Sequence, residues 1–207
     1  MSRNAVLKPI VFVACLASAV ELAVEFFRSS LGPDPVATLQ HQTGMTTLVL
    51  LFVTLAITPL RRITGLLWLV QYRRMIGLFA FFYGTLHLLT YVVLDQSFNL
   101  DAIAADVVKR PFIFAGTLSF LLMVPLALTS TQRAIRRMGK NWQTLHRLVY
   151  LSAAAGVVHF YWEVKLDRTQ PLIFAWILAA LLAYRVAYRL WERWRRTSPA
   201  PTAAPAE

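Results

Sequence analysis

Three of the four histidines in this 207-residue chain lie in apolar stretches of helix length. His146 and His159 share the run from Asn141 to Trp162, and His87 lies in the run from Met75 to Leu94. Burying an ionisable side chain in hydrocarbon is costly, so such residues are candidates for function. A neutral imidazole ligates metals, relays protons or hydrogen-bonds to a neighbouring helix.

The positions of His87 and His159 favour metal ligation. His87 lies 13 residues after Arg74, and His159 lies 13 residues after His146. At about 1.5 Å per residue, each histidine is about 20 Å from the same end of its helix. Two imidazoles at one depth on separate helices match a bis-histidine haem, with the porphyrin in the apolar gap. The alternative is a pair of hydrogen bonds that pack helices.

The two remaining histidines do not fit this pair. On a straight helix, His146 is about 140° around the axis from His159 and about 20 Å below it. We therefore expect it at a second site near the inner face, or as an interfacial histidine. Arg74 is level with it on the third apolar span and cannot ligate iron. His41 falls in an outer polar loop and is expected to be an ordinary surface residue.

The composition is that of a membrane protein, with 57% hydrophobic and 15% charged residues. The net charge of +11 comes from short basic loops between apolar spans, which indicates membrane topology rather than nucleic-acid binding. Cys15 is the only cysteine. An intrachain disulfide, a cysteine-rich metal site and covalent haem attachment are therefore excluded.

Apolar runs near the 20 residues that a bilayer requires predict an all-α integral membrane bundle with six transmembrane helices. They are residues 1–30, Thr43–Leu60 (ended by Pro59), Met75–Leu94, Pro111–Leu128, Thr144–Trp162 and Pro171–Tyr188. The first run is an anchor or a signal peptide cleaved near Ala19, which would leave five spans. The run 63–72 is too short to cross and is expected to lie along the interface.

Basic residues set the expected orientation. The stretches 61–74 and 129–147 hold four and five lysines and arginines and no acidic residue, whereas the alternate loops mix both signs. The positive-inside rule then places both termini in the cytoplasm. We expect one transmembrane haem-binding domain over 1–190. Residues 191–207 are expected to form a cytoplasmic tail, basic at first and then disordered.

Several strings, in this order, closely resemble one family. They are RRMIGLFAFFYGTLHLLTY, KRPFIFAG, LALTSTQ, MGKNWQTLHRLVYL, HFYWEVK and QPLIFA, with GPDPVATLQHQTG before them. The family is MsrQ, formerly YedZ, within the ferric reductase-like transmembrane superfamily. The likeness covers roughly residues 30–185, and the ferric reductase-like core would span about 43–190.

The resemblance implies a multi-pass protein of the bacterial inner membrane that moves electrons outward through b-type haem. The donor would be the quinone pool or a cytoplasmic flavin reductase. The recipient would be MsrP, a periplasmic molybdopterin-containing methionine sulfoxide reductase that repairs oxidised proteins. The family's haem histidines fall on His87, His146 and His159. FMN is also implied, but the chain has no glycine-rich phosphate loop, so the inner basic loops are expected to meet its phosphate.

We therefore expect an electron-transfer subunit rather than a catalytic one, and no residue here is expected to act on methionine sulfoxide. His87 and His159 would hold the outer haem, and His146 would accept electrons near the inner face. The loop from Asp95 to Arg110 is the expected docking loop for the partner. Two alternatives stay open, a haem-containing ferric (metal-ion) reductase and a non-redox transporter or scaffold whose histidines relay protons.

Overall fold

The computed structural model describes residues 3–197, which form helices and turns without a β-strand. The α-helices are α1 (Arg3–Phe27), α2 (Pro35–Thr64), α3 (Val70–Leu89), α4 (Leu100–Lys109), α5 (Pro111–Leu128), α6 (Gln132–Met138), α7 (Lys140–Leu145), α8 (Leu148–Glu163) and α9 (Thr169–Thr197). A 3-10 turn, η1 (Leu67–Leu69), precedes α3, and a π-helix, η2 (Thr90–Asp95), follows it. The predicted all-α class is confirmed.

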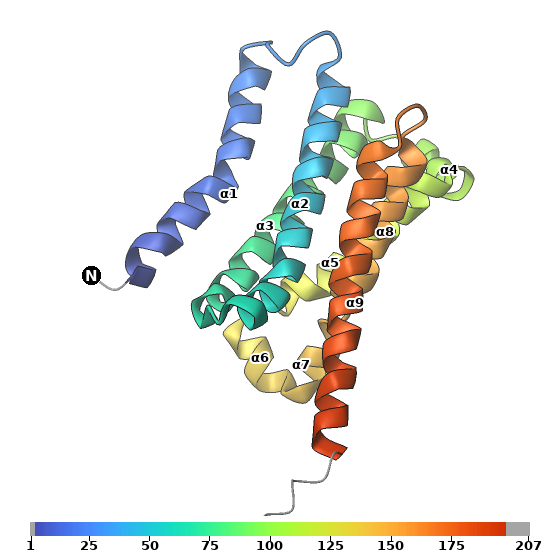
Figure 1. Cartoon of the computed structure of the whole chain (residues 1–207). Helices are drawn as coiled ribbons and strands as arrows, with labels where there is room; N and C mark the ends of the chain where they lie inside the picture. The colour runs from blue at the N-terminus through green and yellow to red at the C-terminus, as the bar shows by residue number, and fades with distance from the viewer. Residues whose placement is uncertain (1–2, 198–207) are drawn as a thin grey trace, which may run out of the picture.

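Two helical hairpins make up the core of the bundle. α2 packs along α3, and α5 packs along α8, with α3 and α5 also in contact (Figure 1). Large apolar side chains and alanines fill the space between these helices, among them Leu51, Phe52, Leu55, Ala80 and Ala153. α1 lies against α3, and α9 lies against α8 and α2. The hairpins therefore bring α3 and α8, which carry His87 and His159, into one core.

Five helical segments within residues 3–197 are long and apolar enough to cross a membrane, and they lie in α1, α2, α3 with its flanking turns, α5 and α9. The sixth predicted span corresponds to α8, which has only 16 residues. The multi-pass character is thus confirmed, whereas the count of six stays a prediction. α6, α7, the α2–α3 turn, the start of α1 and the end of α9 all lie at one end of the bundle (Figure 1). We call this the basic end.

α2 is longer at both ends than predicted. It begins at Pro35, whose missing amide hydrogen is harmless in the first turn, and Asp34 caps it by accepting a 2.9 Å hydrogen bond from the amide of Ala37. His41 therefore lies on a helix and not in a loop, although its side chain is exposed as expected. At the other end the helix continues past Pro59 to Thr64, so the prediction that Pro59 ends it was wrong.

A buried arginine explains how α2 tolerates Pro59. A proline leaves the carbonyl four residues earlier, here that of Leu55, without its helical donor. In a membrane such a carbonyl must find another partner. The guanidinium of Arg185, only 9% exposed on α9, donates Nη2–H to the Leu55 carbonyl and Nη1–H to the Tyr150 hydroxyl at 3.0 Å. Arg185 therefore links α9 to α2 and α8.

Several segments predicted as loops are helical. The connection between α3 and α5 contains α4, and the connection between α5 and α8 contains α6 and α7. Side-chain caps explain two of these helices, because Asn99 caps the start of α4 and Thr131 caps the start of α6. The segment 63–72 is not a separate element. It forms the end of α2, a left-handed Gly65, η1 and the start of α3.

The last helix is also longer than predicted. α9 runs to Thr197, so the expected tail boundary at 191 falls inside it. Its last turns read RLWERWRR and hold no proline or glycine, which is why the helix does not stop where the apolar run stops. The rest of the predicted tail, 198–207, lies outside the described residues.

Candidate functional site

His87 and His159 meet between the two hairpins. Their imidazole ring centroids are 6.0 Å apart and their planes cross at 77°. His87 comes from the last turn of α3, and His159 from the last turns of α8. The prediction that these histidines share one depth on facing helices is therefore confirmed by their contact.

Each of these imidazoles is fixed by a backbone carbonyl of the neighbouring helix. Nδ1 of His87 lies 2.9 Å from the carbonyl oxygen of Gln40 on α2, and Nδ1 of His159 lies 2.7 Å from that of Phe112 on α5. A carbonyl can only accept, so Nδ1 must carry the hydrogen in both rings. Nε2 is then the nitrogen with a free lone pair, as in metal-ligating histidines whose other nitrogen donates to a carbonyl.

The spacing of the pair suits one metal ion with two axial ligands. Two imidazoles bonded to opposite sides of one ion at about 2 Å place their ring centroids roughly 6 Å apart. No group of three or more His, Cys, Asp or Glu side chains gathers into a metal site within residues 3–197. Two neutral nitrogen donors between apolar helices are the donor set of a bis-histidine haem. The residues present therefore fit that group.

His146 does not join this pair. It caps the C-terminus of α7, and the helix is interrupted between it and α8, so the prediction of one straight helix from Thr144 was wrong. Its ring stacks on Trp142, with centroids 3.9 Å apart. The Thr129 hydroxyl donates to the Pro125 carbonyl at 2.6 Å, so it accepts from Nε2 of His146 at 3.1 Å.

The surroundings of His146 disfavour its charged form. Burial lowers the pKa of His146 below its usual range, and the positive charge of Arg73 lowers it further. The indole nitrogen of Trp142 donates to the Thr129 carbonyl at 3.0 Å, which holds the stacked pair against the end of α5. His146 is thus a neutral, half-buried histidine at the basic end of the bundle.

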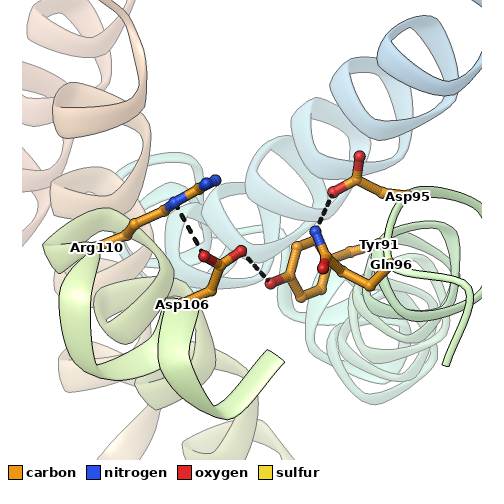
Figure 2. Close-up of polar contacts among 5 residues, drawn as sticks. All are labelled: Tyr91, Asp95, Gln96, Asp106 and Arg110. Carbon is orange, nitrogen blue, oxygen red and sulfur yellow. Dashed lines mark hydrogen bonds and ion pairs between the residues drawn. The ribbon is translucent and has the colours of Figure 1, made fainter. Parts of the chain in front are cut away.

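A polar cluster closes the opposite end, above the histidine pair. Tyr91, one turn after His87, donates its hydroxyl to Asp106 of α4 at 2.9 Å, and Asp106 also pairs with Arg110 at 3.0 Å (Figure 2). Tyr91 belongs to η2, and single π-turns of this kind often occur at functional sites. The cluster fastens α4 over the C-terminal end of α3.

Some of these features could not be found by looking for polar residues. The acceptors for the histidines are the backbone carbonyls of Gln40 and Phe112, which any residue type supplies. Arg185 looks like one more arginine of a basic helix end. A signal did exist for it, because a proline inside an apolar span frees a carbonyl that needs a new donor, and a neighbouring helix can supply one.

Comparisons with known proteins identify the family of the chain. Residues 43–157 match the family described as ferric reductase like transmembrane component. The protein-methionine-sulfoxide reductase heme-binding subunit MsrQ of Azospira oryzae is 49% identical over 198 residues, which cover 95% of this chain and 83% of that protein. The subunits of the same name from Xanthomonas axonopodis and Herminiimonas arsenicoxydans are each 44% identical, covering 94% and 95% of this chain and 93% and 91% of those proteins. No solved structure matches.

Proposed function

Because the chain belongs to the MsrQ family of ferric reductase-like transmembrane proteins, we propose that it is the electron-transfer subunit of a methionine sulfoxide reductase system. In this proposal His87 and His159 hold a b-type haem. The contact between these two imidazoles carries the proposal. The relatives are named heme-binding subunits. When bound, haem supplies reversible one-electron chemistry at its iron.

The protein's own groups position and insulate that site. The carbonyls of Gln40 and Phe112 hold the hydrogen on Nδ1 of each imidazole and fix the ring orientation. Apolar side chains line the contact between α3 and α5 in the same core, where Phe81 and Phe120 stack with centroids 5.5 Å apart. The hydrogen bonds to the Gln40 and Phe112 carbonyls would keep both rings in place during electron transfer.

His146 is proposed to receive electrons at the basic end, by direct ligation of a second haem or as part of a shared site. Its position supports this role, since it lies 13 residues before His159 and at the opposite end of α8. Ligation through Nε2 would require this nitrogen to release the Thr129 hydroxyl and its hydrogen to move to Nδ1. Stacking on Trp142 would keep the ring in place meanwhile.

The proposed membrane is the bacterial inner membrane, with both termini and the basic end in the cytoplasm. The charge distribution supports this orientation. Electrons would come from the quinone pool or a cytoplasmic flavin reductase and leave toward periplasmic MsrP at the α4 end. For FMN, we propose that arginines of the basic end, such as Arg62 and Arg73, bind its phosphate. Acid release of fluorescent flavin from the purified chain tests this, and its absence removes FMN from the proposal.

The second candidate is a ferric reductase, which the description of the matching family favours. One experiment separates the two. The purified protein, carrying its haem, is reduced, and its reoxidation is followed optically. Without oxygen, our proposal predicts rapid and complete reoxidation by a catalytic amount of MsrP only when a methionine sulfoxide substrate is present in excess. Reoxidation by ferric citrate alone, at a rate that MsrP and its substrate do not raise, would contradict it and support metal reduction.

A further inference from the structure

The two hairpins that carry the histidine pair repeat one arrangement 72 positions apart. His159 follows His87 by this interval, Phe112 follows Gln40, and in each hairpin 47 residues separate the acceptor carbonyl from its histidine. Glycines follow the same interval, from Gly44 to Gly116 and from Gly84 to Gly156. The side chains that face Gly84 and Gly156 follow the same interval, since Thr47 faces Gly84 and Ser119 faces Gly156.

Gly44 and Gly116 lie directly beneath the imidazoles. A Cβ atom placed on Gly44 would be 3.0 Å from both Nδ1 and Cε1 of His87. A Cβ atom on Gly116 would be 2.8 Å from Nδ1 of His159 and 3.0 Å from its Cε1. The Gly116 contact is closer than real side chains approach, and the Gly44 contact would require His87 to shift by a few tenths of an ångström, so neither ring could keep its present position beside an alanine.

Helix geometry explains why glycine is needed at these two positions. Gln40 and Phe112 each lie four residues before the glycine, so each carbonyl already accepts the glycine's amide hydrogen within its helix. The second lone pair of that carbonyl remains available to a side chain. A ring that approaches it must pass over the α-carbon one turn later. Only a glycine there leaves the path open, since every other residue carries a Cβ atom.

We propose that the site consists of two equivalent half-sites in which Gly44 and Gly116 are positioning residues. Each bare α-carbon lets the imidazole reach the carbonyl one turn earlier, which fixes the tautomer and presents Nε2 to the iron. This inference rests on the proposed haem function for its consequence, but the packing of ring on glycine exists without the haem.

The half-sites differ in one respect. The hydroxyl of Thr43 lies 3.5 Å from Nδ1 of His87 and offers a second acceptor, whereas the corresponding residue of the other hairpin is Ala115. Gly116 also has the shorter contact. The His159 half-site should therefore tolerate an added methyl group less than the His87 half-site.

Gly77 supplies a matched control on α3. A Cβ atom there would meet only the Thr54 methyl group, at an ordinary 3.6 Å. In all three variants alanine replaces glycine within a helix and raises helix propensity. Any difference between Gly77→Ala and the other two therefore reports the contact with the histidine.

The test measures haem binding by the full-length chain in detergent. Gly116→Ala is expected to lower haem affinity about 10- to 100-fold, as loss of a partner that orients a metal-bound histidine does. Its ferric spectrum should shift from low spin toward high spin. Gly44→Ala should show a smaller loss, and Gly77→Ala should bind like the unchanged chain. Unchanged affinity and spin state in Gly116→Ala would overturn the proposal.

A second measurement needs no haem and tests the proposal even if Gly116→Ala folds poorly. Thermal unfolding of the haem-free protein is compared for Gly116→Ala in the natural and the His159→Ala backgrounds. Gly116→Ala should lower the midpoint only while His159 is present, and Gly77→Ala should show no such dependence. An equal effect in both backgrounds would overturn the proposal. If the unchanged chain does not bind haem, the proposed function is refuted. The comparison of thermal unfolding in the two backgrounds would then still test the role of Gly116.

Discussion

Replacing Arg185 with methionine is expected to destabilise the bundle chiefly through the carbonyl of Leu55. This carbonyl has no helical donor because Pro59 lacks an amide hydrogen, and it depends on the Arg185 guanidinium. A buried acceptor left without a donor costs about 1–3 kcal/mol. Hydrogen bonds between membrane helices average about 0.6 kcal/mol and reach about 1.7 kcal/mol. We therefore assign about 1–2 kcal/mol to this interaction.

A double-mutant cycle isolates that energy. Pro59→Ala restores an amide hydrogen one turn after Leu55, so the carbonyl no longer needs Arg185. Arg185→Met should then cost about 1–2 kcal/mol less in the Pro59→Ala background than in the natural one. The bond to Tyr150 and the guanidinium–ring contact at 5.1 Å are lost in both backgrounds, so they cancel in the difference.

The assay is reversible unfolding in mixed micelles with increasing dodecyl sulfate, followed by helical circular dichroism. Arg189→Met provides the control, since Arg189 is exposed one turn further along α9. Its cost should be the same in the natural chain and in the Pro59→Ala background. If Arg185→Met also costs the same in both backgrounds, the link between the proline and the buried arginine is refuted.

Three further predictions concern other parts of the bundle. The hydroxyl of Ser119 donates to the carbonyl of Ser152 at 2.9 Å, and the hydroxyl of Ser152 donates to the carbonyl of Ser119 at 3.0 Å. Ser152→Ala should therefore lower the free energy of unfolding by about 1 kcal/mol without changing the haem content. A loss of haem would contradict this prediction. Tyr91→Phe removes the bond to Asp106, so hydrogen exchange should speed up in α4 but not in α5; equal protection of α4 in both proteins would refute the role of the cluster. Asp101 and Lys109 are exposed on α4. Lys109→Glu should change the rate of electron delivery to MsrP about tenfold at low salt. An unchanged rate would remove α4 as the docking element.

The sequence predicted the histidine pair because depth along a helix follows from counting residues. His87 and His159 are each 13 residues from a marker at the same membrane face, and helix rise is nearly constant. The fourth span, Pro111–Leu128, was also predicted with its observed bounds. It contains no charged residue, begins at a proline and is followed by polar residues.

The predicted helix boundaries were wrong where a helix continues beyond its apolar run. α9 continues through a polar turn because nothing there breaks a helix, and α2 continues past Pro59 because Arg185 supplies the Leu55 carbonyl with a donor, whereas the change of hydropathy marked only the membrane edge. The break at His146 was missed for the opposite reason, since no glycine or proline marks it. Stacking on Trp142 and the bond to Thr129 hold it, and both are tertiary contacts.

The repeat of the two half-sites was hidden for a similar reason. Only the string G-x-x-H and the isolated glycines recur at 72 positions, and the intervening residues differ. The acceptor positions are Gln40 in one copy and Phe112 in the other, because the acting group is the backbone carbonyl. Because the repeated feature is backbone geometry, few residue types recur between the two copies.

The central claim is that His87 and His159 hold one haem. Its most direct test is the optical spectrum of the purified, detergent-solubilised protein before and after dithionite. We expect a haem Soret band that shifts on reduction, present also in His41→Ala, whose side chain is exposed. The band should be lost or greatly weakened in His87→Ala and in His159→Ala. A chain without a Soret band, or a haem content that neither substitution changes, would contradict the claim.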